Sequence, residues 1–170
     1  MGRTAAAVGT AAFFVVGPGT VAGLVPWWIT GWEFREPLPY WAAAQALGAL
    51  LIAAGVYVLA GAFVAFARAE GTPVPAAPTR RLVVEGFHRY VRNPMYVALI
   101  AVVLGQALLF GQLGPVGYAL VMWAVAAAFV RWYEEPKLAE QFGGEYAAYR
   151  AHVPAWWPRL RPWTPGVRPR

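Results

Sequence analysis

The 170-residue chain has no cysteine, only two histidines and few charged side chains. The absence of cysteine excludes disulfides, thiolate catalysis and cysteine-ligated metal sites. Two histidines, His88 and His152, are too few for a histidine-rich metal site, so no bound metal is expected. Charged residues make up 13% of the chain, about half the share of a typical soluble domain, which argues against a soluble fold.

Apolar and aromatic residues are abundant instead. Hydrophobic residues make up 59% of the chain, and nine tryptophans and eight tyrosines suit aromatic belts at lipid headgroups. Long apolar runs lie at 5–30, 39–67, 94–110 and 116–133. The expected fold is therefore an all-α, polytopic integral membrane protein with about four transmembrane helices. Apolar spacing of three or four residues over 134–152 predicts a further, C-terminal interfacial helix.

We expect a single membrane domain with three parts. Residues 1–70 hold the first two transmembrane helices, 71–154 a loop, the helical hairpin and the tail helix, and 155–170 an interfacial tail. Gly17–Gly19 interrupts the first run and predicts a kink or break, which serves either packing or a ligand groove. Prolines over 71–78 predict an extended segment along the membrane surface.

The basic residues predict the orientation. Arginines gather in the 68–92 loop and in the tail after 131, whereas the 31–38 loop holds one and the 111–115 turn none. Both basic segments are expected on the cytoplasmic side, and four spans then place both termini there. The net charge of +6 does not indicate nucleic-acid binding, because these arginines border apolar segments.

The candidate site lies at the start of the third run. Asn93-Pro94 is typical of a helix N-cap followed by proline at the first helical position. The partial positive charge of this helix end, with Arg89 and Arg92 beside it, predicts binding of a carboxylate or phosphate.

The fourth run returns to the same level and ends at Glu134 and Glu135, so these carboxylates are expected near Arg92. Cations and carboxylates together suit a ligand with an amino-acid end and a ribose. The alternative is that Arg92 and Arg131 only neutralise the two glutamates at the interface.

Several short motifs resemble the isoprenylcysteine carboxyl methyltransferase family and the related phospholipid N-methyltransferases. They are Arg92-Asn93-Pro94-Met95-Tyr96, Glu134-Glu135, Phe142-Gly143 and Tyr146-x-x-Tyr149, and the resemblance covers about residues 71–154. It implies an integral-membrane methyltransferase that uses S-adenosylmethionine and releases S-adenosylhomocysteine. It also implies a multi-pass protein of a bacterial or archaeal inner membrane, with its active site facing the cytoplasm.

The resemblance also implies roles for residues. Those implied as catalytic are Arg92, Tyr96 and Glu135; those implied as cofactor-binding are Gly86, His88, Arg92, Asn93, Pro94, Tyr96, Glu134 and Glu135. Asn93 stands where the family pattern has histidine and cannot carry a proton at neutral pH. His88 is expected to be a surface histidine, or otherwise a weak candidate base.

The expected chemistry is direct, in-line methyl transfer to a lipophilic small molecule or lipid-linked acceptor that enters from the bilayer. The partners are this acceptor and membrane lipids. The sequence leaves open whether oxygen, nitrogen or sulfur is methylated, and also the oligomeric state. Two other classes remain: a non-enzymatic membrane scaffold or ligand-binding protein, favoured by Asn93, and a transporter, favoured by the interrupted first helix.

Overall fold

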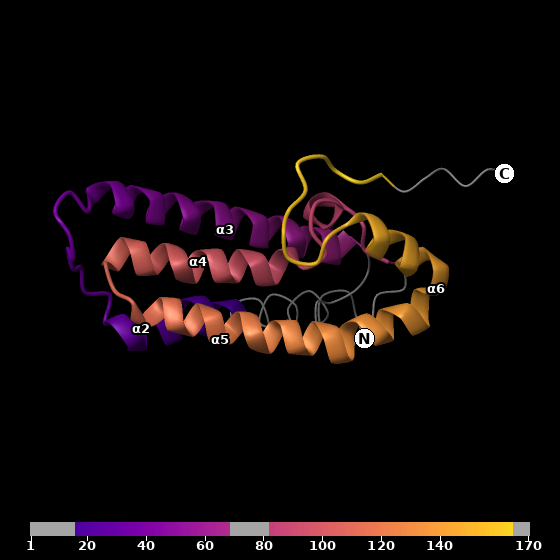
Figure 1. Ribbon diagram of the computed structural model, residues 1–170, viewed down its shortest axis with the longest axis horizontal. Helices are drawn as coiled ribbons and strands as arrows, with labels where there is room; N and C mark the ends of the chain where they lie inside the picture. Colours follow the sequence, from indigo (N-terminus) through magenta and orange to yellow (C-terminus); the bar gives the residue numbers. More distant parts are fainter. Residues whose placement is uncertain (1–15, 69–81, 165–170) are drawn as a thin grey trace. The chain divides into compact units, whose positions relative to one another are not determined.

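A computed structural model describes residues 16–68 and 82–164, and this part of the chain contains helices and no strand (Figure 1). The all-α prediction is confirmed for these residues. The elements, in chain order, are η1 (Thr20–Leu24), α2 (Val25–Thr30), α3 (Ala42–Arg68), η2 (Gly86–Arg89), α4 (Pro94–Phe110), α5 (Gly114–Phe129), η3 (Val130–Glu134) and α6 (Glu135–His152).

The chain forms two compact units. The first contains the residues up to Tyr57 together with Tyr96–Val125, and the second contains Val58–Met95 together with the residues from Ala126 onward. Helices α3, α4 and α5 each pass from one unit into the other. The polar segment that carries most of the candidate site belongs wholly to the second unit.

Glycines in the first unit allow α3 and α4 to pack closely. A Cβ atom at Gly48 would lie 2.5 Å from the carbonyl oxygen of Gly105, and one at Gly55 would lie 2.8 Å from that of Ala98. Backbone atoms cannot move aside as a flexible side chain can, so only glycine fits at these positions. The expectation that glycines let the helices approach closely is confirmed here.

Replacing Gly48 by valine should therefore separate α3 from α4. We expect the free energy of unfolding to fall by about 1–3 kcal/mol, the usual cost of overpacking. Gly117→Val is the matched control, because a Cβ atom at Gly117 meets nothing within 4 Å. Thermal unfolding in detergent measures both variants, and equal midpoints for the two would contradict the close packing.

Where a kink or break was predicted at Gly17–Gly19, residues 16–30 stay helical, and the π-helical turn η1 follows directly. In η1 the N–H of Val25 donates to Thr20, which leaves the carbonyl of Val21 without its usual donor. Pro26 has no N–H, so the carbonyl of Ala22 also lacks its α-helical donor.

Side chains from two other helices satisfy these carbonyls. Gln106 Nε2 donates to Ala22 over 2.6 Å, and the hydroxyl of Tyr118 donates to Val21 over 3.1 Å. An unpaired carbonyl is costly where water is absent, so these two bonds stabilise the irregular turn. The irregular turn η1 thus serves packing, because it binds side chains of α4 and α5.

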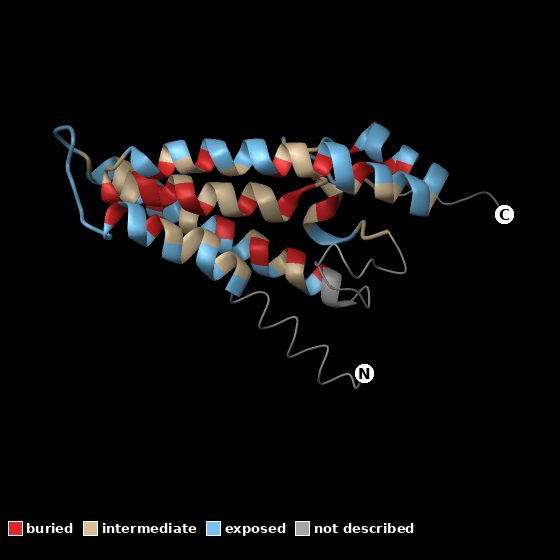
Figure 2. Cartoon of the chain, turned by 90° about the horizontal axis from the view of Figure 1, so that it is seen from below, coloured by how far each residue is buried: buried red, intermediate tan, exposed pale blue. Residues whose placement is uncertain are grey.

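Two helical segments are long and apolar enough to cross a membrane, namely Ala42–Ala65 and the continuous helix Gly114–His152. Helix α4 is a shorter apolar helix, and the first apolar run lies partly outside the described residues. Figure 2 shows long exposed faces on the helices, where apolar side chains such as Leu50 and Val125 are 67% and 64% exposed. Exposed apolar faces of this kind suit contact with lipid.

The tail helix predicted over 134–152 is confirmed as α6, Glu135–His152, and a π-helical turn rather than a loop joins it to the fourth apolar run. α5 continues through the π-helical turn η3 into α6, and the backbone of Gly143 interrupts this 39-residue helical segment. About 20 helical residues cross a hydrocarbon core, so only part of these 39 residues can lie in one. The predicted extended segment at 71–78 lies outside the described residues.

Candidate functional site

The short helix η2 fixes the start of the polar segment in the second unit. Gly86 has φ +55°, a left-handed conformation that favours glycine, and it opens η2. A Cβ atom at Gly61 on α3 would lie 2.5 Å from the ring of Phe87 in η2, so the two elements are in close contact. Gly86 thus allows the left-handed backbone conformation that begins η2.

His88 is buried, and the expectation of a surface histidine is wrong. Its residue surface is 5% exposed, and its backbone carbonyl accepts a 2.7 Å hydrogen bond from the hydroxyl of Tyr149. Burial lowers the pKa of His88 to about 4, against a smaller opposite effect of a hydrogen bond with the backbone of Glu85. The ring is therefore neutral at pH 7 and a poor proton acceptor there.

The lowered pKa of His88 predicts acid sensitivity. As the pH falls below about 6.5 the unfolded chain binds a proton at this position before the folded chain does, so stability is lost until about pH 4. The expected loss is about 2 kcal/mol between pH 7 and pH 5. Unfolding midpoints should show this dependence in the wild type and in the exposed control His152→Gln, but not in His88→Gln. Equal pH dependence in all three would contradict it.

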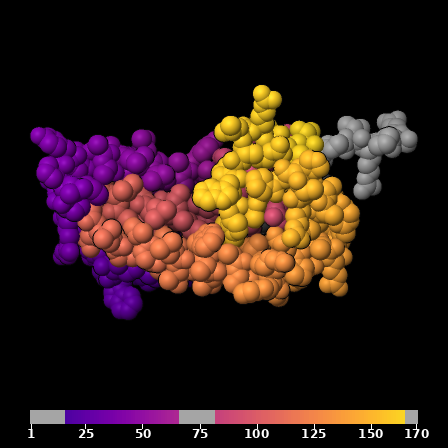
Figure 3. All heavy atoms as spheres, viewed as in Figure 1, coloured from indigo at the N-terminus to yellow at the C-terminus, as the bar shows by residue number. Residues whose placement is uncertain are grey.

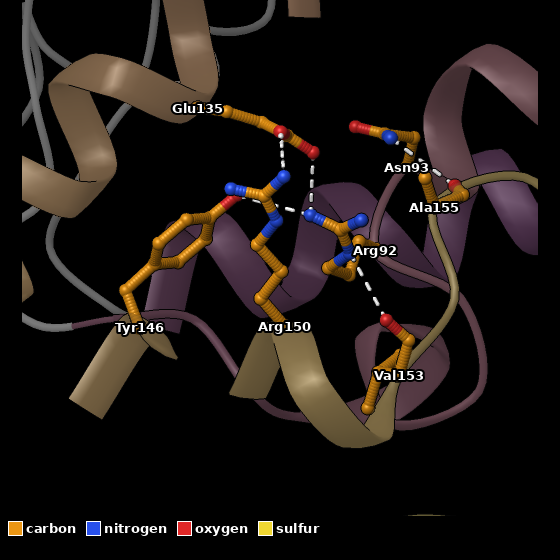
Figure 4. A network of polar contacts seen from close by, with 7 residues as sticks. All are labelled: Arg92, Asn93, Glu135, Tyr146, Arg150, Val153 and Ala155. Carbon is orange, nitrogen blue, oxygen red and sulfur yellow. Dashed lines mark hydrogen bonds and ion pairs between the residues drawn. The ribbon is translucent and has the colours of Figure 1, made fainter. Parts of the chain in front are cut away.

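Arg92 stands at the centre of a polar network (Figure 4). Its Nη1 donates to Glu135 Oε1 over 2.6 Å and to the hydroxyl of Tyr146 over 3.1 Å, and its Nε donates to the carbonyl of Val153 over 3.0 Å. The side chains of Arg92 and Glu135 are 12% and 7% exposed. The predicted proximity of Arg92 and Glu135 is confirmed.

Arg150 completes the network, a role that its place in the sequence does not indicate. Its Nη2 lies 3.4 Å from Glu135 Oε2, so one buried carboxylate pairs with two guanidinium groups. In a straight helix Arg150 would be about 22 Å along the axis from Glu135. The backbone of Gly143, with φ 50° and ψ −121°, interrupts the helical conformation and lets α6 bend back (Figure 1).

An open depression of about 390 Å³ adjoins this network on α6. Tyr146 and Arg150 contribute to its wall, and the remainder of the wall consists of small residues, namely Ala139, Gly143, Ala147 and Ala151. Its volume is at the lower end of the range for small-molecule sites. Because Arg150 is half exposed, a ligand there can reach its guanidinium group.

Glu134 differs from its neighbour Glu135. Its Oε2 atom is buried and makes no hydrogen bond within the part of the chain that the structure describes. A buried carboxylate oxygen without a donor is costly, so it needs a physical explanation such as a role in binding or catalysis. The predicted approach of Glu134 to Arg92 stays a prediction.

The remaining predicted residues surround the start of α4. Pro94 is the first residue of this helix, as predicted, and is fully buried. Asn93 is 8% exposed, and its Nδ2 donates to the carbonyl of Ala155 over 3.1 Å. Tyr96 lies in the first turn of α4 but belongs to the first unit. The side-chain amide of Asn93 thus binds the backbone of the C-terminal segment at Ala155.

The tail segment Val153–Thr164, which we call the strap, lies along the turn at 89–93. The N–H of Arg92 donates to Pro154, that of Arg159 to Tyr90, and that of Trp163 to Arg89. Arg89 returns two side-chain bonds to the end of the strap, from Nε to the carbonyl of Trp163 and from Nη2 to Thr164 Oγ1. Arg89, the second cation predicted beside the helix end, therefore donates hydrogen bonds to the strap.

The described residues thus combine a buried arginine–carboxylate pair with apolar helices of membrane-spanning length. The chain belongs to the phospholipid methyltransferase family, whose family model matches residues 43–145. This confirms the family resemblance of the sequence motifs, and the matched range contains Arg92, Glu134 and Glu135.

Two curated relatives are similar to this chain. It is 35% identical over 75 residues to a protein-S-isoprenylcysteine O-methyltransferase of Schizosaccharomyces pombe, a match that covers 44% of this chain and 31% of the relative. It is 32% identical over 76 residues to protein-S-isoprenylcysteine O-methyltransferase B of Arabidopsis thaliana, covering 44% of this chain and 38% of the relative. The chain thus spans about a third of the length of these relatives. No solved structure matches it.

Proposed function

We propose that the protein is an integral-membrane methyltransferase that uses S-adenosylmethionine to methylate a lipophilic acceptor. The observation that carries the proposal is the network that Arg92, Tyr146 and Arg150 form around the buried carboxylate of Glu135, in a chain of the phospholipid methyltransferase family. The proposed cofactor site includes the predicted residues Gly86, His88, Arg92, Asn93, Pro94, Tyr96, Glu134 and Glu135.

The residues present fit this cofactor. Arg92 and Arg150 are cationic groups that suit its carboxylate, and together they carry one charge more than Glu135 neutralises. The buried Oε2 of Glu134 is an acceptor for an ammonium group or a ribose hydroxyl. The carboxylate and the ammonium group of the cofactor thus each have a counterpart of opposite charge within the second unit.

The protein's own residues bind and orient the cofactor and the acceptor, and they exclude water from them. When bound, S-adenosylmethionine supplies an activated methyl group that an electron-rich acceptor atom attacks directly. Hydrogen bonds to the carbonyl of Val153 and to the hydroxyl of Tyr146 fix the orientation of the Arg92 guanidinium group. We assign Tyr96 to orienting the acceptor through its hydroxyl and Glu135 to fixing Arg92. His88 is neutral at pH 7 and therefore adds no charge to the site.

Transfer of a labelled methyl group tests this function. Purified protein in lipid nanodiscs is incubated with methyl-labelled S-adenosylmethionine and with either an S-prenylated cysteine bearing a free carboxylate or phosphatidylethanolamine. We expect label in one of the two lipophilic acceptors, and none with the Arg92→Met variant. Label in neither acceptor nor in a membrane lipid extract would contradict the function.

A non-enzymatic ligand-binding protein is the second candidate. It is favoured by the use of Arg92 and Asn93 to hold Glu135 and the strap, since these side chains then act within the protein. Binding of S-adenosylhomocysteine without any methyl transfer would support this candidate over the enzyme.

The proposal includes four spans with both termini on the cytoplasmic side, where the polar site would meet soluble cofactor. The chain is free of cysteine, so single cysteines introduced at Arg3 and Leu113 can be labelled without background. We expect an impermeant thiol reagent applied from one side of the membrane to label only one of the two positions. Labelling of both from the same side would contradict the four-span topology.

A further inference from the structure

The strap has an inner and an outer side with different chemistry. On the inner side Val153 is 1% exposed, and the ring of Trp163 lies 5.7 Å from that of Tyr149. On the outer side Trp157 is 81% exposed and Leu160 is 99% exposed. The strap, yellow in Figure 3, therefore presents large apolar side chains at the surface although its inner side is well packed.

All charged side chains of the strap are basic. Between 153 and 164 the sequence contains two arginines and no acidic residue, and Arg159 and Arg161 flank the exposed Leu160. Arg161 is exposed, and Arg159 uses one guanidinium nitrogen to donate to the carbonyl of His152 over 2.9 Å. Exposed apolar side chains interleaved with arginines suit the interface of a bilayer, where acyl chains lie beneath anionic headgroups.

The strap is also connected to a segment of membrane-spanning length. It is hydrogen-bonded to Arg89 at the end of η2, and Phe87 of η2 packs against Gly61 of α3. Gly61 lies near the end of the apolar segment Ala42–Ala65. All these contacts lie within the second unit, so the outer side of the strap is held near the end of a helix that suits a bilayer.

We propose that the outer side of the strap binds an anionic lipid surface, with Trp157 and Leu160 in the interface and Arg159 and Arg161 at headgroup phosphates. Two exposed apolar side chains are too small a patch for a stable protein partner, which needs about 800 Å². Tryptophan, by contrast, favours the membrane interface. Prolines at 154, 158 and 162 restrict the strap backbone and so reduce the entropy lost on binding.

This contact bears on the site itself, a step that rests on the proposed function. Consecutive carbonyls of the strap accept from Arg92 and Asn93, namely those of Val153, Pro154 and Ala155. A strap held on lipid keeps these acceptors in place and so keeps Arg92 oriented. Cofactor binding should therefore be tighter on an anionic bilayer than on a neutral one.

The test places a fluorescent label on Leu160→Cys, at a position that is almost completely exposed in a cysteine-free chain. The protein is studied without cofactor in nanodiscs of phosphatidylcholine alone, or of phosphatidylcholine and phosphatidylglycerol in equal parts. We expect a water-soluble quencher to reach the label less in the anionic nanodiscs. Each arginine should favour the lipid-bound strap by roughly fivefold.

Arg161→Gln should raise quenching in the anionic nanodiscs by up to about fivefold and change little in the neutral ones. The matched control is Arg35→Gln, which removes the same charge from a side chain that is 64% exposed. Equal quenching in both lipid compositions, or no difference between the two variants, would overturn the proposal. So would protection that grows with protein concentration, which indicates a second copy of the chain.

A second titration separates this proposal from the proposed function. S-adenosylhomocysteine is titrated into the same two kinds of nanodisc, and we expect tighter binding in the anionic ones and loss of this difference in Arg161→Gln. Absence of binding in both would contradict the cofactor site and leave the quenching result standing. Equal binding in both would overturn the link between the strap and the site.

Discussion

Replacing Arg92 by methionine should abolish binding of S-adenosylhomocysteine and also lower the free energy of unfolding by about 3–5 kcal/mol, because the change removes one partner of a buried ion pair. Among the described residues, Glu135 would keep its ion pair with Arg150, at 3.4 Å, and the carbonyl of Val153 would lose the Nε donor of Arg92. Calorimetric titration and thermal unfolding measure the two effects.

Two control variants make the Arg92 result specific. Arg131→Met removes an equal charge from an exposed position and should leave stability and affinity near the wild type. Tyr146→Phe removes one acceptor of Arg92 and keeps its ion pair, so a smaller loss of about 1 kcal/mol in stability is expected. If Arg92→Met behaved like Arg131→Met, Arg92 would not be the centre of the site.

The second large effect is expected at Glu134. Glu134→Gln should weaken binding of S-adenosylhomocysteine by about tenfold or more, because a charge-assisted hydrogen bond to the ligand is lost. The thermal midpoint should stay constant or rise, since Oε2 of Glu134 makes no hydrogen bond within the described residues and its negative charge is costly there.

Glu135→Gln is the matched comparison for Glu134→Gln. It should lower both the midpoint and the affinity, because Glu135 pairs with Arg92 and Arg150. The two variants thus separate a carboxylate that holds the protein together from one that is available to a ligand. Wild-type affinity in Glu134→Gln would contradict its assignment to the cofactor.

The sequence predicted the helices well where apolar runs had clear ends. The run at 94–110 coincides with α4, because Asn93-Pro94 begins the helix and Gly111, with φ +63°, follows its end. The start of α6 near residue 134 was also predicted, but the π-helical turn η3 that joins it to α5 was not. The register of such a turn depends on tertiary packing rather than on local propensity.

The site was predicted in part. Opposite charges at the two ends of an apolar hairpin correctly indicated the pairing of Arg92 and Glu135. Arg150 was missed because a regular helix keeps it far from Glu135, and only the backbone of Gly143 brings it back. The strap was also missed as a binding partner of Arg92, because backbone carbonyls have no signature in a sequence.

Prediction failed for His88 for a different reason. A single histidine in a polar loop is usually exposed, and no local pattern indicated that the hydroxyl of Tyr149 would reach its backbone from α6. Burial of this kind follows from long-range packing among Tyr146, Tyr149 and Val153. Spacing within the sequence does not report it.

The central claim is that Arg92, Glu134, Glu135 and Arg150 form a site for S-adenosylmethionine. Its most direct test is calorimetric titration of the product S-adenosylhomocysteine into the wild-type protein in lipid nanodiscs, beside Glu134→Gln under the same conditions. We predict saturable binding at one site per chain and affinity about tenfold or more weaker in the variant. Absence of heat in the wild type, or equal affinity in both proteins, would contradict it.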